Sequence, residues 1–336
     1  MADASKMLMP FAPAGRLAHP LAFSLTTGQP FSTLTRATFQ STSGKSKMVK
    51  AEGPILSGEQ LAQYEESGFI HSIPVLSADE VAYYRAEVEK TRQAISNHVA
   101  RLNTLHLFFR WAWDLSTHPR LLNCLEQILG PNILLKSTRL FYKSGKSAAY
   151  VGWHQDGVTE RLHDPRTPAI WLGLTAATVE NGCLRVVPRS HRFGFVDHTS
   201  SPDVAPLPGS TSPPVESWVR TYGDELSERI TRIQPDSDSA FDLVMRPGMM
   251  SIHHPVTLHG SNPNLSTEPR IGLSASYSTP ELYHGDGPVV WARGDAPRDG
   301  YRFRIIDEPP TVTFEAAVAE YRDGEGRMLF SDGRPS

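Results

Sequence analysis

The sequence predicts a mainly β protein, a sandwich or jelly roll, whose N-terminal part is helical. Two observations carry this prediction. Helix-capping signals and helical periodicity are confined to the part of the chain before Pro131. After Pro131, short apolar runs alternate with turns that contain Gly and Pro, and many short strands separated in this way are typical of sandwiches and jelly rolls.

The first fifty residues differ from the rest of the chain. They hold six Lys and Arg residues against the single acid Asp3, and they are rich in Ser and Thr. This composition is typical of an organelle transit peptide. Several prolines and a lack of periodicity fit a disordered extension equally well. We therefore predict one domain over residues 51–336 and exclude residues 1–50 from the fold.

Three helices are expected next. Ser57-Gly-Glu-Gln60 and Ser77-Ala-Asp-Glu80 both have the spacing of a capping box, in which two orphan backbone donors are satisfied reciprocally. Behind Ser77, apolar residues recur at helical intervals. A third helix is predicted to begin near Pro119 and to end at Gly130-Pro131, which is a stop signal. The first half of the chain is therefore expected to be mostly helical.

The second half is expected to be built from strands. The candidate strands are residues 133–143, 150–155, 169–175, 183–188, 241–246, 249–254 and 270–278. The stretch 197–238 is rich in Pro, Ser and Asp and is expected to be a long insertion. Loops of that length are often lids over a site, or disordered.

Composition limits the partners and the location. A formal net charge of -3 gives no reason to expect binding to nucleic acid or to an anionic membrane. No apolar run is long enough for a transmembrane helix. Cys124 and Cys183 are too few for a disulfide framework, so a reducing compartment fits best. We expect a cytoplasmic protein, or an organellar one (mitochondrion or plastid) if residues 1–50 are a transit peptide.

The segment Gly152-Trp-His-Gln-Asp-Gly157 suggests a metal site. In a strand, residues i and i+2 point to the same face, so His154 and Asp156 could bind one ion together. Such a pair also occurs by chance, as an incidental ion pair on a surface strand. Two histidines and one carboxylate form the facial triad of iron(II) oxygenases, which leaves positions open for a bidentate 2-oxo acid and dioxygen.

Three histidines are candidates for the third ligand. His253 and His254 are adjacent, so only one of them can face the metal from a strand. His259 is favoured because Gly-Ser follows it and Arg270 lies eleven residues later. A guanidinium fork suits the remote carboxylate of a 2-oxo diacid better than an ammonium does.

At these residues the sequence resembles the phytanoyl-CoA dioxygenase family of Fe(II)/2-oxoglutarate oxygenases, over roughly residues 57–285. The motifs that carry the resemblance are Leu129-Gly-Pro-Asn-Ile133, Trp153-His-Gln-Asp156, Asn181-Gly-Cys-Leu184, Pro188-Arg-Ser-His191 and His259-Gly-Ser261 with Arg270. The resemblance implies a double-stranded β-helix (a cupin-like jelly roll) with helices packed on one side. It also implies a small-molecule hydroxylase that consumes 2-oxoglutarate and O2 and releases succinate and CO2.

The resemblance also implies roles for single residues. Iron would be held by His154, Asp156 and His259, and 2-oxoglutarate chiefly by Arg270. Further co-substrate contacts fall on Ser261, Trp171 and Arg139. Trp171 could equally be a core residue, and Ser261 a turn residue. Halogenating relatives have a small residue in place of the carboxylate, so the presence of Asp156 favours hydroxylation or another oxidative outcome.

Several alternatives remain open at this point. The basic cluster Arg185, Arg189, His191 and Arg192 could recognise an anionic substrate or could be a solvated edge. The same metal ligands could serve a cupin-like hydrolase or isomerase that does not use 2-oxoglutarate. The chain could also be a non-catalytic jelly-roll binding module. The sequence identifies neither the substrate nor the oligomeric state.

Overall fold

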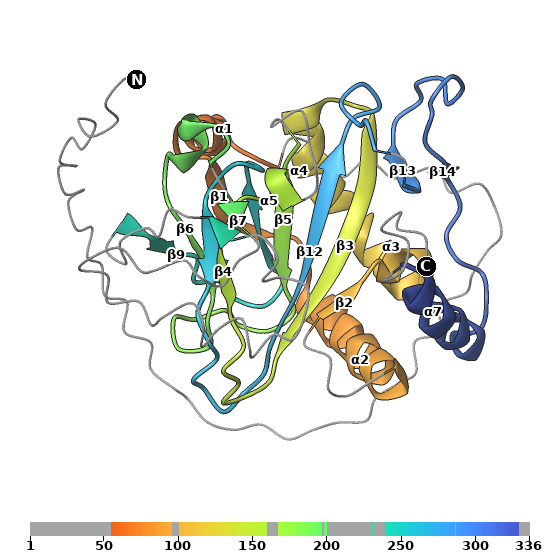
Figure 1. Cartoon of the computed structure of the whole chain (residues 1–336), viewed down its shortest axis with the longest axis horizontal. Helices are drawn as coiled ribbons and strands as arrows, with labels where there is room; N and C mark the ends of the chain where they lie inside the picture. Colours follow the sequence, from red (N-terminus) through yellow and green to blue (C-terminus); the bar gives the residue numbers. More distant parts are fainter. Residues whose placement is uncertain are drawn as a thin grey trace. The chain divides into compact units, whose positions relative to one another are not determined.

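The computed structural model describes residues 55–95, 101–159, 167–196, 198–199, 230–231, 239–285 and 287–328. The predicted extension 1–50 lies outside these residues. So does the predicted insertion 197–238, apart from a short antiparallel ladder between β7 (His198–Thr199) and β8 (Ile230–Thr231). The other elements are shown in Figure 1.

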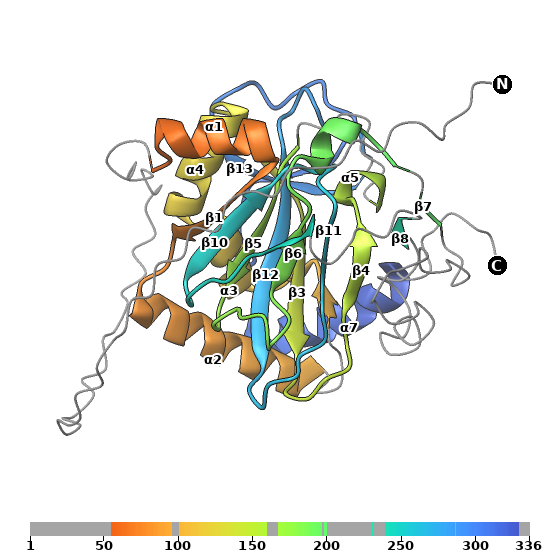
Figure 2. The same cartoon turned by 90° about the vertical axis from the view of Figure 1, so that its left-hand side faces the viewer.

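Two β-sheets form the body of the structure. The larger sheet has eight strands in the order β1-β10-β5-β12-β3-β13-β14, with β2 paired to β3, and the smaller has the order β4-β11-β6-β9. Apart from the parallel pair β13 and β14, the pairings in these two sheets are antiparallel. Figure 2 shows β4, β11 and β6 alongside the larger sheet. This arrangement confirms the predicted jelly roll.

The strands of the larger sheet are β1 (Phe69–Pro74), β2 (Arg101–Asn103), β3 (Ile133–Lys143), β5 (Ala169–Gly173), β10 (Met249–His253), β12 (Arg270–Ser278), β13 (Val289–Arg293) and β14 (Ile305–Ile306). Those of the smaller sheet are β4 (Val151–His154), β6 (Leu184–Val186), β9 (Phe241–Asp242) and β11 (His259–Ser261).

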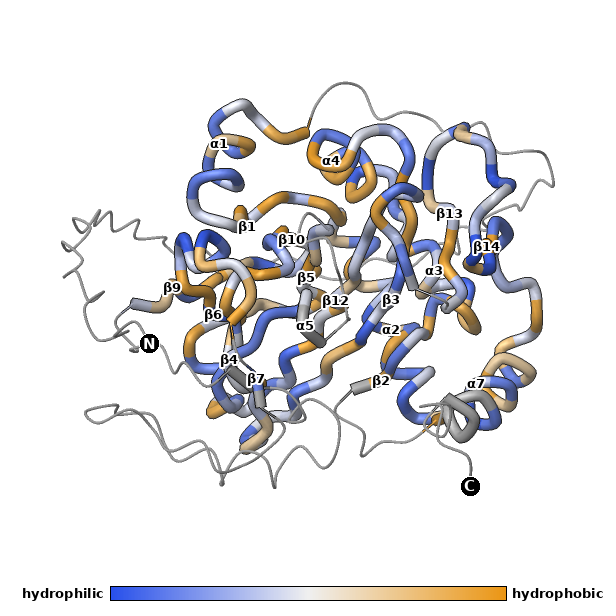
Figure 3. Tube along the Cα trace, turned by 45° about the horizontal axis from the view of Figure 1, so that its top comes forward, coloured by the Kyte–Doolittle hydropathy of each residue, from blue (hydrophilic) through white to orange (hydrophobic). Residues whose placement is uncertain are grey.

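The helices are α1 (Gly58–Ser67), α2 (Ala78–Ile95), α3 (Arg110–Ser116), α4 (Pro119–Leu129), α5 (Asp156–Thr159) and α7 (Phe314–Met328), with 3-10 turns η1 (Leu105–Leu107) and η2 (Ser190–Phe193). Both predicted capping boxes are present, because Ser57 and Ser77 each exchange hydrogen bonds with the residue three positions on. The third predicted helix is α4, and its alternation of hydrophobic and hydrophilic residues is visible in Figure 3. None of the helices in the described part of the chain is long and apolar enough to cross a membrane.

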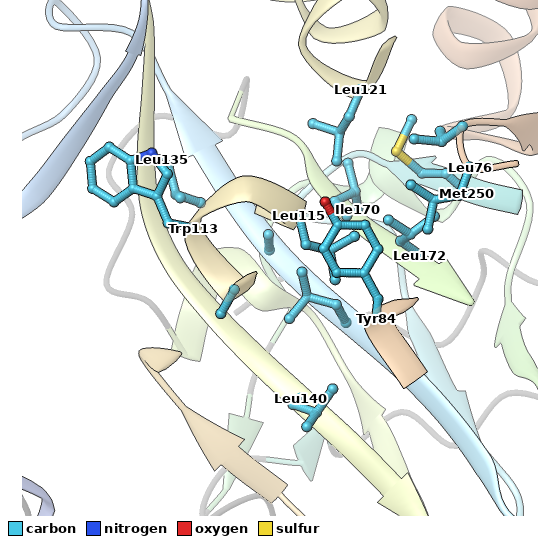
Figure 4. Close-up of a cluster of buried hydrophobic side chains, with 14 of the residues drawn as sticks. Leu76, Tyr84, Trp113, Leu115, Leu121, Leu135, Leu140, Ile170, Leu172 and Met250 are labelled. Atoms are coloured by element: carbon cyan, nitrogen blue, oxygen red, sulfur yellow. The ribbon is translucent and has the colours of Figure 1, made fainter. Parts of the chain in front are cut away.

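The two faces of the larger sheet have different roles. Ile170 and Leu172 of β5 pack with apolar residues of α2, α3 and α4 in the main hydrophobic core (Figure 4). Trp171, between them, faces the smaller sheet and packs with Leu184 and Val186 of β6. Alternation along a strand therefore separates a helix-facing core from an inner face between the sheets, and the candidate site lies on this inner face.

The prediction was wrong in two respects. Helices make up most of the described chain before Pro131, as expected, but the two strands β1 and β2 in this part were missed, and they pair with β10 and β3. The strand predicted at 150–155 ends at His154, because Asp156 begins α5. The strands predicted at 169–175, 183–188, 241–246 and 249–254 are each shorter than expected, whereas 133–143 and 270–278 match β3 and β12.

Tyr277 ties β12 to the helical layer, since its buried hydroxyl donates a hydrogen bond to the carbonyl of Ser116 at 2.7 Å. Tyr277→Phe removes the donor and leaves a buried carbonyl unsatisfied. We expect the free energy of unfolding to fall by about 1–2 kcal/mol, measured by urea denaturation. Tyr83→Phe, at an exposed position, is the matched control. Equal stability of the two variants would contradict this assignment.

Candidate metal centre and co-substrate site

Three side chains with metal-ligating atoms converge between the sheets. His154 is the last residue of β4, and His259, the first residue of β11, is its directly opposed partner. Asp156 follows at the start of α5. The Oδ1 atom of Asp156 lies 3.4 Å from His154 Nε2 and 3.7 Å from His259 Nε2. The ligand atoms of these three residues all lie within 4.8 Å of one another, and the side chains are largely buried.

Backbone carbonyls orient both imidazoles in the same way. His154 Nδ1 lies 2.9 Å from the carbonyl of Gly152, and His259 Nδ1 lies 2.9 Å from the carbonyl of Thr257. A carbonyl only accepts, so each Nδ1 carries the proton and each Nε2 presents its lone pair to the centre. Burial and the neighbouring His154 hold the pKa of His259 well below its usual value, which keeps its ring neutral.

The carboxylate of Asp156 completes a converging set of acceptors. Burial alone would raise the pKa of Asp156, but the histidines around it, His259 foremost, outweigh burial and hold this pKa well below its usual value. Two imidazole lone pairs and one carboxylate oxygen therefore face one point. Such a set repels itself unless a cation lies between its members. The donor set thus fits a divalent metal ion, and two histidines with one carboxylate match the preference of non-haem iron.

His253 holds the second oxygen of the same carboxylate. Its Nε2–H donates to Asp156 Oδ2 at 3.2 Å, and the ring is buried. Because Oδ2 is engaged in this way, Oδ1 is the oxygen left for a metal. The adjacent His254 lies elsewhere, with its ring 5.3 Å from that of His191. As expected, only one of the two adjacent histidines faces the site, and it is His253. The third member of the converging set is His259, which was the favoured candidate.

Gln155 fixes the turn that carries the ligands. Its side-chain amide donates to the carbonyls of Gly194 and Val256 at 2.8 and 2.7 Å, and its Oε1 accepts from the backbone N–H of Val196 at 2.9 Å. Its backbone N–H donates to His198 Nε2 at 3.0 Å. Gln155 is buried between two potential ligands and positions them, a role that was not predicted because its contacts are far away in the sequence.

Arg270 and Trp171 form a buried pair on the inner face. The guanidinium carbon of Arg270 lies 4.5 Å from the centre of the Trp171 ring. Gly272 permits this arrangement, since a Cβ atom there would lie 2.1 Å from Trp171 Cζ2. The indole N–H of Trp171 is buried and has no hydrogen-bond acceptor among the described residues. A ligand with carboxylate or carbonyl oxygens would supply one.

Ser261 and Arg139 lie on different elements. Ser261 is the buried last residue of β11, two positions after His259, and its hydroxyl accepts a hydrogen bond from Lys143 Nζ at 2.7 Å. Arg139 lies on β3 opposite Ser274 of β12, which is itself opposite Trp171. Opposed residues share a face of a sheet, so Arg139 is on the inner face, half-buried.

The predicted basic cluster does not converge on the metal ligands. Arg189 and Arg192 both pair with Glu66. Arg185 pairs with Asp242 at 2.9 Å. His191 faces the backbone carbonyl of Glu65 at 3.1 Å. The side chains of this basic cluster are therefore paired with acidic side chains and a backbone carbonyl.

The fold and the converging ligands define a class, that of jelly-roll metalloproteins with a two-histidine, one-carboxylate centre. Within this class, the family model for phytanoyl-CoA dioxygenase (PhyH) matches residues 64–272. The chain therefore belongs to the phytanoyl-CoA dioxygenase family, and the resemblance seen in the sequence is confirmed.

The relatives whose names state an activity are only distantly similar to this chain in sequence. An ectoine dioxygenase of Nocardia farcinica is 27% identical over 66% of this chain and 78% of its own. A probable alpha-ketoglutarate-dependent hypophosphite dioxygenase of Stutzerimonas stutzeri is 25% identical over 77% of this chain and 93% of its own. Among solved structures, the non-heme monooxygenase ThoJ superposes with a TM-score of 0.63 at 25% identity, over 80% of this chain and 95% of its own.

The hydrogen bond from His253 is expected to control metal affinity. His253→Phe keeps the ring shape but leaves Asp156 Oδ2 without its donor, so the carboxylate loses its fixed orientation. Removing an outer-shell partner of this kind weakens metal binding by about 10–100-fold, which calorimetric titration with Co(II) would measure. His253→Asn, which keeps a donor, should recover part of the affinity, and His254→Phe should leave it unchanged. Equal affinities for the two Phe variants would contradict the assignment.

Proposed function

We propose that this protein is an Fe(II)/2-oxoglutarate-dependent dioxygenase that hydroxylates a small-molecule metabolite. The observation that carries the proposal is the converging set of His154, Asp156 and His259, which meets the inner face of the larger sheet at His253, together with the buried pair of Arg270 and Trp171 on that same face. Family membership supports it. Relatives named as ectoine dioxygenase and as an alpha-ketoglutarate-dependent dioxygenase support it as well.

The metal would be held by the Nε2 atoms of His154 and His259 and by Oδ1 of Asp156. When bound there, iron together with 2-oxoglutarate and O2 would supply the oxidising power that hydroxylates a substrate C–H bond, with release of succinate and CO2. The contribution of the protein is to hold these ligands deprotonated and aimed. The carbonyls of Gly152 and Thr257 and the imidazole of His253 do so.

Arg270 would bind the remote carboxylate of 2-oxoglutarate. Its guanidinium fork can donate two parallel hydrogen bonds to a carboxylate, and burial strengthens such a pair relative to one in water. The Trp171 ring lies against the guanidinium and limits its rotation, while the indole N–H offers a further donor. We propose co-substrate contacts for Ser261 and Arg139 as well, because Arg139 lies on the inner face and Ser261 contacts Lys143.

The rival functions explain fewer features. A cupin-like hydrolase or isomerase would use the same three ligands but has no use for a buried guanidinium stacked on an indole. A non-catalytic binding module has no need for three acceptors aimed at one point, since such a set costs stability without a cation. The dioxygenase accounts for both features.

Three narrower proposals accompany the function. Residues 51–336 form one catalytic domain, which fits a single compact unit between Met48 and Ser336. A cytoplasmic location fits the two free, buried cysteines. An anionic substrate remains a prediction, although the basic cluster that suggested it is engaged by Glu66 and Asp242.

The test of the function is a spectroscopic titration without oxygen. We expect Fe(II) and 2-oxoglutarate together to give a metal-to-ligand charge-transfer band in the visible range. Asp156→Ala should abolish the band by removing a metal ligand. Arg270→Ala should weaken it by raising the Kd for 2-oxoglutarate about 10–100-fold, the loss expected for charge-assisted hydrogen bonds. Arg192→Ala, an exposed arginine, should behave as wild type.

The outcomes separate the alternatives. A protein that binds Fe(II) but shows no band with 2-oxoglutarate would contradict the dioxygenase and favour the cupin-like enzyme. A protein that binds neither would favour the binding module. Succinate release from 2-oxoglutarate then provides the assay for screening substrates.

A further inference from the structure

Lys143 is a buried lysine whose hydrogen-bond acceptors are all neutral. It is the last residue of β3 and is only 1% exposed. Its Nζ lies 2.7 Å from Ser261 Oγ, 2.5 Å from the carbonyl of Asn262 and 3.4 Å from the carbonyl of Ser261. Lysine is almost never fully buried unless a charged partner accompanies it, so this position needs an explanation.

The neighbouring strand adds a second cation. Lys143 is directly opposed by Arg270 on β12, and opposed residues share one face of a sheet. Burial and the charge of Arg270 both lower the pKa of Lys143 well below its usual value. Among the buried residues that the structure describes, Asp156 is the one acid, and it is engaged by histidines. Two basic side chains thus lie close together away from water, and an incoming anion would favour the charged form of Lys143.

Lys143 also determines what Ser261 can do. An anion bound beside Lys143 favours the protonated amine, which has only donors, so in the occupied pocket the Ser261 oxygen accepts the hydrogen bond from Nζ. The hydroxyl proton of Ser261 is then free to point elsewhere and to donate. Ser261 lies on β11 two positions after His259. The contact therefore converts a group that could either donate or accept into a donor.

We propose that Lys143 is a positioning residue for the remote carboxylate of the co-substrate. It fixes the Ser261 hydroxyl as a donor and, together with Arg270, gives the pocket a positive charge that selects a dicarboxylic 2-oxo acid over a monocarboxylic one. This inference rests on the proposed function, because the anion in question is 2-oxoglutarate. Lys143 acts through its hydrogen bond to Ser261 and through the electrostatic potential of its charge, without touching the co-substrate.

The test compares two 2-oxo acids in the Mn(II)-loaded protein by isothermal titration calorimetry, which needs no turnover. For Lys143→Met we expect the Kd of 2-oxoglutarate to rise about tenfold or more. The affinity for the monocarboxylate 2-oxobutyrate and for Mn(II) should stay within about twofold. A Kd for 2-oxoglutarate that does not change would overturn the proposal. So would an equal loss for both acids or for the metal, which would indicate a merely structural lysine.

Further variants keep the test decisive if Lys143→Met folds poorly. Lys143→Gln keeps amide donors for the two carbonyls but removes the charge, and it should lose 2-oxoglutarate affinity in the same way. In the double variant with Ser261→Ala, the two losses should be less than additive, since one residue acts through the other. Lys146→Met is the matched control, because this exposed lysine donates to the nearby carbonyl of Leu265.

Failure of the inference can be told apart from failure of the function. If the wild-type protein binds no 2-oxoglutarate in the presence of metal, the proposed function itself is contradicted. If the wild-type protein binds 2-oxoglutarate and the Lys143 variants bind it equally well, only the proposed role of Lys143 is contradicted.

Discussion

The candidate site depends on one backbone pairing, that of β11 with β4 in the smaller sheet. The pairing places His259 opposite His154, and each imidazole is then fixed by the carbonyl of the residue two positions earlier. With both Nδ1 protons engaged, two lone pairs must face inward. Asp156 follows two positions after His154 and adds a carboxylate oxygen. The stability lost by converging three acceptors is recovered only if a cation binds, so the backbone geometry of two short strands sets the chemistry of the centre.

The larger sheet supplies the rest of the site through alternation along its strands. Its helix-facing residues are mostly apolar and form the main core, whereas the inner face carries Trp171, Arg270 and Lys143. Gly272 has no side chain at a position where a Cβ atom would collide with the Trp171 ring, which lies against its backbone. Metal ligands come from the smaller sheet and the co-substrate cations from the larger one. Closure of the jelly roll is therefore what brings the two halves of the proposed chemistry together.

The sequence predicted the long elements and the residue types of the site better than it predicted its geometry. Strands β3 and β12 were found in full because each is long, apolar and bounded by clear turns. Strand β11 has only three residues and depends on partners more than seventy positions earlier in the chain, so no local pattern could reveal it. His154 and Asp156 do not share a strand face, as had been predicted, since β4 ends at His154 and Asp156 begins a helix. The buried side chain of Gln155, whose contacts are all non-local, brings the two together instead. Lys143 and His253 were missed as positioning residues for the same reason.

The most direct test of the central claim is an anomalous diffraction map from crystals grown without oxygen in the presence of Fe(II) and 2-oxoglutarate. We predict one iron peak within coordination distance of Nε2 of His154, Nε2 of His259 and Oδ1 of Asp156, with the remote carboxylate of 2-oxoglutarate against Arg270. An iron peak at another set of side chains, or a 2-oxoglutarate molecule that does not contact Arg270, would contradict the account.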